Sequence, residues 1–530
     1  MNRGILDRVR ITAVILCVWL CNASHAQELK YAYADSTWEM PDRLFVVADD
    51  LPNPMIYIPA PVDTASAAFS RDFLKWQWGK VIRQNPNGTR TQRGTYAYND
   101  AQYGLNRWCN ILTTIIKTSV TSNLTPKVVY LIYNAGESGS VSTQFAKLGY
   151  MRRRPVSQMN ETAWGRNEVT EDLLTSGSFP SSHAAFGWAV GLAFAEIMPE
   201  LQDTLMARAY TYGENRTIVG AHWMSDVEAA FLTASAAVAH IHTLDTFKAA
   251  MLAAQNEYYT IKGTSPNYNV GLPDGNRIQQ HSAIDTTSEY YFSDVQGYWQ
   301  AKAERETVRG DTAIIDSDDS EHALLQMFGD IMNDKLVISV KPNTVELIRM
   351  TRAAFIESAQ QMGAGSPFRK RPYVQLGEPT LIPDHEQYYA DKTSYPSTKA
   401  MIGWGLALLL SEIAPEYNEA LLKRGYDYGH SRVIAGYNYP SDVMAGRIQA
   451  AAVLAYLHGQ EEFKQLMEAA KQEHIDPMYI VTEVSDIISD KSSSGDDMWF
   501  TATGIRLHGR PTVPGIYIHG NKKVVVRLDD

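Results

Sequence analysis

The sequence predicts an all-α protein made of two tandem helical bundles, followed by a short β-rich tail. Three observations predict this class. Apolar residues recur at helical spacing in two long segments, Ala184 to Met198 and Ala400 to Ile413, which suit buried core helices. The chain also repeats itself, at an offset of 216 residues that relates Pro199 to Pro415. Alternating apolar residues broken by Gly and Pro, typical of short strands, are scarce before residue 500 and frequent after it.

Residues 1–26 are expected to form a signal peptide. Three arginines precede an apolar run from Ile11 to Cys21, and Ser24 and Ala26 supply the small side chains of a cleavage site. The run is shorter than the ~20 residues of a membrane-spanning helix, and no later apolar stretch reaches that length. We therefore expect an exported bacterial protein, periplasmic, secreted or at the cell surface, with no transmembrane span in the mature chain.

Composition narrows the class of partner. The 530 residues are 45% apolar and have a formal net charge of -11, which suits a globular protein of two or three domains. A nucleic-acid partner is not expected, because it would favour a basic surface. A small anionic substrate stays compatible, since a local cluster of Arg and Lys can dominate one pocket. Cys109, alone after signal cleavage, is expected to be a buried, inert thiol. Homo-oligomerisation is compatible with the sequence, which does not predict it.

The internal repeat sets the expected domain boundaries. We place the first repeat at residues 40–262, a Gly-, Pro- and Asn-rich linker at 263–282, and the second repeat at 283–475. A weaker similarity between Phe69-Ser-Arg-Asp and Phe292-Ser-Asp indicates that each repeat begins well before its main motifs. Residues 500–530 form the β-rich tail. It resembles, loosely, the C-terminal sorting or anchoring modules of the type IX secretion route, and a simple β-extension packed on the second bundle explains it equally well.

Three clusters in the first repeat form a chemical set. Ser181 or Ser182 is expected to cap a helix that starts near His183, where main-chain N–H groups and the helix dipole favour an anion. His222 and Asp226 are four residues apart, so on a helix they would share one face. The carboxylate would then hold the imidazole Nδ1–H and leave Nε2 free as a nucleophile. Guanidinium and ammonium groups suited to phosphoryl oxygens accompany them, at Lys147, Arg154 and Arg216.

The order and spacing of these clusters resemble the three-part signature of the type-2 phosphatidic acid phosphatase superfamily. Residues 50 to 255 are similar to its class A nonspecific acid phosphatases in particular. The resemblance implies the helical bundle of the acid phosphatase and vanadium haloperoxidase type, with no metal and no cofactor. It also implies that His222 is the nucleophile and forms a phosphohistidine, that Asp226 orients it, and that His183 is the general acid. Phosphate binding would fall to Lys147, Arg154, Ser181, Ser182 and Arg216.

Two positions depart from the family pattern. Ser182 replaces its usual Gly, and Asn215 replaces its usual Ser; both replacements are small and polar, so no chemical role is lost. An acidic optimum is expected, because His183 must be protonated while His222 is not, and an ordinary His titrates near ~6.5.

The second repeat lacks this chemistry. It keeps Arg371, Ser397, Arg432 and Asp442 but has Lys399 at the position of His183, Asn438 at that of His222 and Ala364 at that of Lys147. An Asn cannot accept the phosphoryl group, and a Lys with a pKa near ~10.4 is a poor proton donor at acidic or neutral pH. We expect a degenerate repeat that supports the first one, and favour this role over anion binding through Arg371, Lys399 and Arg432.

The function predicted from the sequence is that of an exported acid phosphatase acting on phosphorylated small molecules. Alternatives are a vanadate-dependent haloperoxidase or a phosphotransferase using the same pocket, or a non-catalytic protein that binds phosphorylated ligands. A membrane lipid phosphatase is disfavoured, because the chain has no multi-span hydrophobic pattern.

Overall fold

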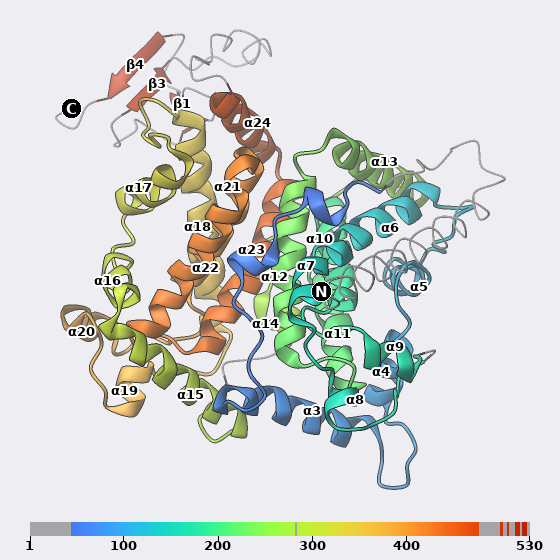
Figure 1. Ribbon diagram of the computed structural model, residues 1–530. Helices are drawn as coiled ribbons and strands as arrows, with labels where there is room; N and C mark the ends of the chain where they lie inside the picture. Colours follow the sequence, from blue (N-terminus) through green and yellow to red (C-terminus); the bar gives the residue numbers. More distant parts are fainter. Residues whose placement is uncertain are drawn as a thin grey trace, which may run out of the picture.

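The computed structural model describes residues 44–166, 168–280 and 284–475, together with four strand segments, 499–501, 506–507, 515–519 and 522–526. The predicted signal peptide lies outside the described residues. Figure 1 shows two helical units side by side, the first in blue to green and the second in yellow to orange. The predicted all-α class with two domains is confirmed.

The first repeat consists of twelve α-helices and three short 3-10 helices among the described residues. They are η1 (Ala48–Asp50), α2 (Pro54–Tyr57), η2 (Ala67–Phe69), α3 (Ser70–Arg83), α4 (Gln92–Asp100), α5 (Leu105–Ile116), α6 (Pro126–Val141), α7 (Gln144–Tyr150), α8 (Pro155–Gln158), α9 (Thr170–Thr175), α10 (Ser182–Ile197), η3 (Pro199–Leu201), α11 (Gln202–Ile218), α12 (Met224–Ile241) and α13 (Asp245–Lys262).

The second repeat and the segments around it follow the same order. They are α14 (Gly275–Gln279), α15 (Glu289–Ala303), η4 (Glu304–Glu306), α16 (Val308–Ile315), α17 (Glu321–Met332), α18 (Pro342–Ala364), α19 (Pro372–Leu376), η5 (Pro383–His385), α20 (Glu386–Tyr389), α21 (Thr398–Ile413), η6 (Pro415–Tyr417), α22 (Asn418–Ile434), α23 (Pro440–Gly459) and α24 (Glu461–Ile475).

Helices α10 and α21 form the centre of their repeats. Almost every residue of each is buried, as expected for a helix that is apolar on all sides. Helix α10 packs against α6, α11 and α12, and α21 packs against α18, α22 and α23. These are the two buried helices that the sequence predicts. The long Ala-rich segments after the last motif are also helical and buried, as predicted, in α12 and α23.

One glutamate near the end of each repeat joins its last helix to the start of an earlier helix, in the same way in both repeats. Glu257 on α13 accepts hydrogen bonds from the main-chain N–H groups of Lys127 and Val128 at the start of α6, at 3.0 and 2.9 Å. Glu473 on α24 does the same at the start of α18, where Asn343 N and Thr344 N donate at 2.8 and 2.9 Å. These carboxylates satisfy N–H groups that have no partner within their own helices.

The two repeats pack directly on each other. Helices α10 and α12 of the first repeat contact α21 and α23 of the second, and one continuous cluster of buried apolar residues spans both units. Smaller contacts extend the interface: the rings of Tyr57 and Trp404 lie 6.2 Å apart, and Asn53 N donates to Glu419 Oε1 at 2.9 Å. The core therefore does not end at the repeat boundary.

The linker contains a short helix that contacts both repeats. In α14, the Arg277 guanidinium donates to Thr204 of the first repeat at 2.8 Å, and Gln279 donates to the Ala445 carbonyl of the second at 3.0 Å. The Gly-, Pro- and Asn-rich segment thus joins the units through specific contacts.

Four strands follow the second repeat: β1 (Trp499–Thr501), β2 (Arg506–Leu507), β3 (Gly515–His519) and β4 (Lys522–Val526). They form one antiparallel sheet in the order β2-β1-β3-β4. Among the described residues no single helix has the length and apolarity to cross a membrane; only α12 and α13 taken together pass that test, as a pair bent by 98°.

Candidate active site

His222 lies in the turn between α11 and α12, not on a helix as the four-residue spacing predicts. Helix α12 begins at Met224, and Trp223 is its N-cap. Asp226 is the third residue of this helix, and its carboxylate turns back to accept from Trp223 N at 2.8 Å. That arrangement serves the N-terminal N–H groups of the helix. The spacing of the two residues therefore reflects a helix start and not a shared helix face.

The imidazole of His222 is oriented by a main-chain carbonyl. Its Nδ1 lies 2.8 Å from the Ser178 carbonyl oxygen and 3.6 Å from Asp226 Oδ2. Asp226 instead accepts a hydrogen bond from the Ser178 hydroxyl at 2.5 Å. The expectation that Asp226 directly binds the Nδ1–H is thus wrong in this structure. Nδ1 donates to the carbonyl, and Asp226 bonds to the Ser178 hydroxyl beside the ring. Nε2 is directed toward Arg154.

Arg154 and Lys147 are fixed around His222 by carbonyl oxygens. Arg154 Nη1 lies 2.6 Å from His222 Nε2, while Nη2 donates to Gly177 O at 3.0 Å. Lys147 Nζ donates to the carbonyls of Gly177 and Pro180, at 2.9 and 2.8 Å. Burial and neighbouring cations lower the pKa of Lys147 well below its ordinary value and that of Arg154 to about 10.

His183, on the first turn of α10, packs against two tyrosines. Its ring stacks on Tyr212, with centroids 4.3 Å apart, and Tyr103 lies 5.7 Å away. Its Nε2 is buried and has no hydrogen-bond partner among the described residues. Burial lowers the pKa of His183 well below its usual value, and the positive charges of Arg216 and His222 lower it further. The same burial, with Arg154 and Lys147, lowers the pKa of His222.

The predicted helix cap is confirmed and its position is settled. Ser181 is the N-cap of α10, and its hydroxyl accepts from Ala184 N at 3.2 Å. Ser182 is the first helical residue, and its hydroxyl lies 2.7 Å from that of Thr143. Arg216, near the end of α11, forms an ion pair with Glu168 and keeps two nitrogens, Nε and Nη1, without a partner among the described residues.

A buried Arg–Asp network holds Asp226 in place. The sequence did not predict its residues, Arg152 and Asp72, as part of the site. Arg152 Nη1 donates to Asp226 Oδ1 at 2.6 Å, and Nη2 donates to Asp72 Oδ2 at 2.9 Å. Asp72 also accepts from Ser225 N at 2.8 Å. The similarity between Phe69-Ser-Arg-Asp and Phe292-Ser-Asp was the available signal for Asp72. A single sequence offered no reason to prefer Arg152 over its two neighbouring arginines.

The structure thus brings six of the eight residues predicted for the first site within electrostatic reach of one another, namely Lys147, Arg154, His183, Arg216, His222 and Asp226. Ser181 and Ser182 lie at the start of α10, beside His183. A family model described as the PAP2 superfamily matches residues 127–249 and 358–465. A non-specific acid phosphatase of Providencia stuartii is 32% identical over 223 residues, which are 42% of this chain and 87% of that protein. The chain belongs to the PAP2 superfamily.

Two further relatives of this PAP2 protein are similar to parts of it. A non-specific acid phosphatase of Salmonella typhimurium is 28% identical over 206 residues, 39% of this chain and 80% of that protein. An acid phosphatase of Zymomonas mobilis is 39% identical over 105 residues, 20% of this chain and 40% of that protein. The two regions matched by the family model correspond to a tandem PAP2 protein.

The second PAP2 repeat retains the supporting network of the first. Arg369 donates to Asp442 Oδ1 at 2.5 Å and to Asp294 Oδ2 at 2.6 Å. Asn438 Nδ2 donates to the Ser394 carbonyl at 2.6 Å, the bond that His222 Nδ1 makes to Ser178 in the first repeat. Ser397 is the N-cap of α21, as Ser181 is of α10. The frame is therefore preserved around a side chain that is not a nucleophile.

Aromatic rings take the space beside the remaining cations. The guanidinium of Arg432 lies 4.5 Å from the ring centre of Tyr437, and that of Arg371 lies 4.8 Å from the ring of Tyr389. The two tyrosine rings also contact each other at 5.4 Å. Stacking of this kind stabilises a buried guanidinium without an anion.

Lys399, at the position of His183, points to acceptors of its own repeat. Its Nζ donates to the Ser317 carbonyl and lies 3.6 Å from Asp319 Oδ2. Burial and Arg432 lower the pKa of Lys399 to about 7. An ammonium engaged in this way is not available as a free anion ligand.

Proposed function

We propose that the protein is an exported acid phosphatase that hydrolyses phosphate monoesters in its first repeat through a phosphohistidine at His222. One observation supports this most strongly. The Nε2 atom of His222 lies 2.6 Å from Arg154 Nη1, and the positive charges of Arg154, Lys147 and Arg216 all act on its ring. A phosphoryl dianion attracted by these three side chains would have its phosphorus beside the nitrogen.

The reaction proceeds in two displacements. In the first, the Nε2 lone pair of His222 attacks phosphorus, the P–O bond to the leaving group breaks, and His183 donates a proton to the departing oxygen. In the second, a water attacks the phosphohistidine, gives its proton to His183, and the P–N bond breaks to release phosphate and regenerate His222. The hydrogen bond from Nδ1 to the Ser178 carbonyl stabilises the positive charge that develops on the ring.

The protonation states fit this order. The lowered pKa of His222 favours an unprotonated Nε2, whose lone pair accepts from Arg154 Nη1 in the free protein. A bound phosphoryl group would take over this donor and free the lone pair for attack. The lowered pKa of His183 arises from burial and from the positive charges of the pocket. A bound dianion offsets those charges and raises the pKa of His183, so the general acid acquires its proton together with the substrate.

The test is turnover of p-nitrophenyl phosphate combined with trapping of the intermediate. His222→Ala removes the attacking nitrogen, and we expect at least a 10³-fold loss of kcat with no acid-labile, base-stable phosphate on the quenched protein. The matched control is Asn438→Ala, which truncates the equivalent side chain of the second repeat and should leave turnover unchanged. Full turnover in His222→Ala, or a wild type that binds phosphate without turnover, contradicts the proposal.

We propose that the second repeat is a structural partner of the first and does not bind phosphate. The stacked tyrosines at Arg371 and Arg432 and the engaged ammonium of Lys399 support this assignment. Phosphate titration of His222→Ala followed by a site-specific probe, such as protection of Lys399 from acetylation, is the test. Protection by millimolar phosphate at Lys399 would show an anion site instead.

Export rests on the predicted signal peptide. Cell fractionation and N-terminal sequencing of the mature chain test it, with a start at Gln27 expected. The same fractionation of a chain that ends at residue 475 tests whether the β-rich tail directs sorting or anchoring. An unprocessed protein in the cytoplasm would contradict export.

A further inference from the structure

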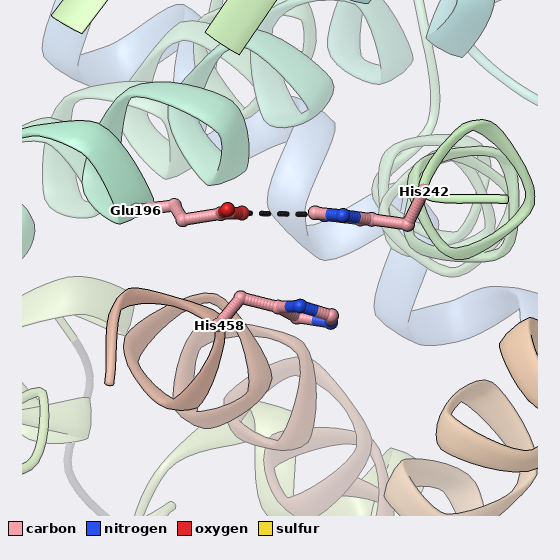
Figure 2. Close-up of side chains that lie close together, drawn as sticks. All are labelled: Glu196, His242 and His458. Carbon is pink, nitrogen blue, oxygen red and sulfur yellow. Dashed lines mark ion pairs between the residues drawn. The ribbon is translucent and has the colours of Figure 1, made fainter. Parts of the chain in front are cut away.

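Four titratable side chains meet at the interface between the repeats, far from the candidate active site. Glu196 lies on α10 and His242 is the C-cap of α12; Glu412 lies on α21 and His458 on α23. The 216-residue offset relates Glu196 to Glu412 and His242 to His458, so each repeat contributes one carboxylate and one imidazole. Figure 2 shows three of them, Glu196, His242 and His458, projecting toward one another from separate helices.

Three of the four side chains place donor atoms close enough to share one ion. One ligand atom each of Glu196, His242 and His458 lies within 4.8 Å of the others. His242 Nε2 is 3.2 Å from Glu196 Oε2, and His458 Nε2 is 2.9 Å from Glu412 Oε1. The two imidazole rings stack, with centroids 4.0 Å apart and planes 12° apart. Tetrahedral zinc at ~2.0–2.2 Å from each donor needs donor separations of roughly 3.5 Å. On binding zinc, the donors of Glu196, His242 and His458 would therefore move closer together, and Glu412 would turn from His458 toward them.

The cluster borders a small cavity with apolar walls. The cavity has a volume of about 20 Å³, room for a single water or ion. Leu192, Val238, Leu408 and Leu454 line it together with the four titratable residues. The side chain of Glu412 is only 2% exposed, and its Oε2 atom has no hydrogen-bond partner among the described residues. A carboxylate oxygen left in this state is costly unless a cation faces it.

The charge of the cluster requires a positive partner. Two carboxylates with two neutral imidazoles have a charge of -2 in surroundings that disfavour it. Glu196 and Glu412 raise the pKa of His242 in spite of its burial. The other charged groups that act on the cluster, Lys464 and Lys471 of α24, lie at its edge, and Lys471 also pairs with Glu468. Either two protons on the imidazoles or one divalent cation completes the balance.

We propose that Glu196, His242, Glu412 and His458 bind one divalent transition-metal ion, with zinc the ion that fits best, and that this ion joins the two repeats. Two imidazole nitrogens and two carboxylate oxygens are a donor set suited to zinc and too rich in nitrogen for calcium or magnesium. With four protein ligands and neutral imidazoles, a zinc ion makes the cluster electrically neutral. The site is structural, because no coordination position is left for a substrate.

This site cannot be predicted from the spacing of its residues in the sequence. Its ligands are separated by 46 residues within each repeat and by 216 between repeats, and neither spacing resembles a zinc motif. Only the packing of α10 and α12 on α21 and α23 brings the four side chains together.

The experiment measures metal content and thermal unfolding of the full chain. Wild-type protein, stripped with chelator and dialysed against zinc, is expected to hold one zinc per chain by mass spectrometry, and its Tm should rise on zinc addition. A crystal should give an anomalous peak at the zinc edge between the four side chains. His458→Gln and His242→Gln, which keep the size of the side chain, should lose the zinc and the zinc-dependent rise in Tm.

The matched control is His474→Gln, which removes a histidine that pairs with Glu416 at the surface, 2.7 Å away, and leaves the cluster intact. It should retain one zinc. Phosphatase turnover reports folding in every variant, so a variant that turns over but holds no zinc supports the site. A wild type that binds no stoichiometric zinc, or variants that hold zinc and shift in Tm like the wild type, would overturn the proposal and leave a doubly protonated His–Glu cluster.

Discussion

His222 and Asn438 occupy the same place in their two repeats and make the same hydrogen bond to a main-chain carbonyl. The difference is that the imidazole has a second nitrogen, Nε2, which contacts Arg154 and can be protonated, whereas the Asn side chain ends in an amide. Asn438 therefore shows how an Asn side chain fits at this position. Asn is the natural replacement for testing what the His222 ring adds to stability and to turnover.

The first prediction concerns pH and stability. The pKa values of His183 and His222 are lowered in the folded chain, whereas they are near ~6.5 in the unfolded chain. The unfolded chain therefore takes up protons first, and stability is complete above pH ~6.5 and falls as pH decreases below it, by up to ~1.4 kcal/mol per pH unit for each histidine. We expect His222→Asn to flatten this dependence in urea unfolding between pH 7 and 5.

The reciprocal substitution is the control. Asn438→His places an imidazole among Arg371, Arg432 and Lys399 and should steepen the same dependence. Equal slopes for wild type and both variants would show that these rings are not held neutral by their surroundings.

A second prediction at the residue scale concerns Arg152. Its guanidinium bridges Asp72 and Asp226 in a bidentate arrangement that an ammonium cannot reproduce. Arg152→Lys should let Asp226 and the His222 turn shift, lowering kcat about 10- to 100-fold with a small change in KM. Arg369→Lys alters the matching network of the second repeat. We expect both substitutions to reduce the free energy of unfolding by about 3 kcal/mol, and Arg369→Lys to leave kcat unchanged. Equal kcat losses in both variants would refute a positioning role for Arg152.

At the scale of elements, the central helix of each repeat packs on the following helix through one Gly and one Ala. The two residue types are on opposite helices in the two repeats. Where α10 meets α11, Gly191 faces Ala209; where α21 meets α22, Ala407 faces Gly425. A Cβ added at Gly191 would lie 2.5 Å from the Cβ of Ala209, and one added at Gly425 would lie 2.5 Å from that of Ala407. Each crossing therefore has room for one methyl group.

We expect Gly191→Ala to destabilise the protein by about 1–3 kcal/mol through overpacking. Adding Ala209→Gly recreates the pair found in the second repeat and should recover part of that loss, because Met206 Sδ and Leu205 O, at 3.5 and 3.7 Å, leave the new methyl group room. A double-mutant cycle measured by urea unfolding gives the coupling. Strictly additive effects would mean that the two positions do not compete for one space.

At the scale of the whole molecule, we expect the two repeats to unfold as one cooperative unit. Their cores are continuous, α14 bonds to both, and each contributes two of the proposed metal ligands to the cavity between them. We expect a single calorimetric transition with equal calorimetric and van't Hoff enthalpies. Phe355→Ala, in the core of the second repeat, should lower the temperature at which the first repeat loses phosphatase activity, in step with Tm. Two resolved transitions would show independent domains.

The sequence by itself determined the helical class, the tandem repeat and the Ser-capped helix at the centre of each repeat. These follow from local properties: helical periodicity, Ser at an N-cap, and motif spacing within one chain segment. The roles of the eight residues assigned to the first site stay a prediction. The interpretation of His222 and Asp226 as neighbours on one helix failed, because a helix start and a helix face give the same spacing.

Only the tertiary structure decided which groups orient His222, namely the Ser178 carbonyl and the Arg152–Asp72 network. It also decided that tyrosine rings stand beside the second repeat's cations, and that Glu196, His242, Glu412 and His458 line one small cavity between the repeats. Each of these contacts joins residues far apart in the chain. Their proximity depends on how buried helix faces pack, and that packing leaves no periodic signal in a single sequence.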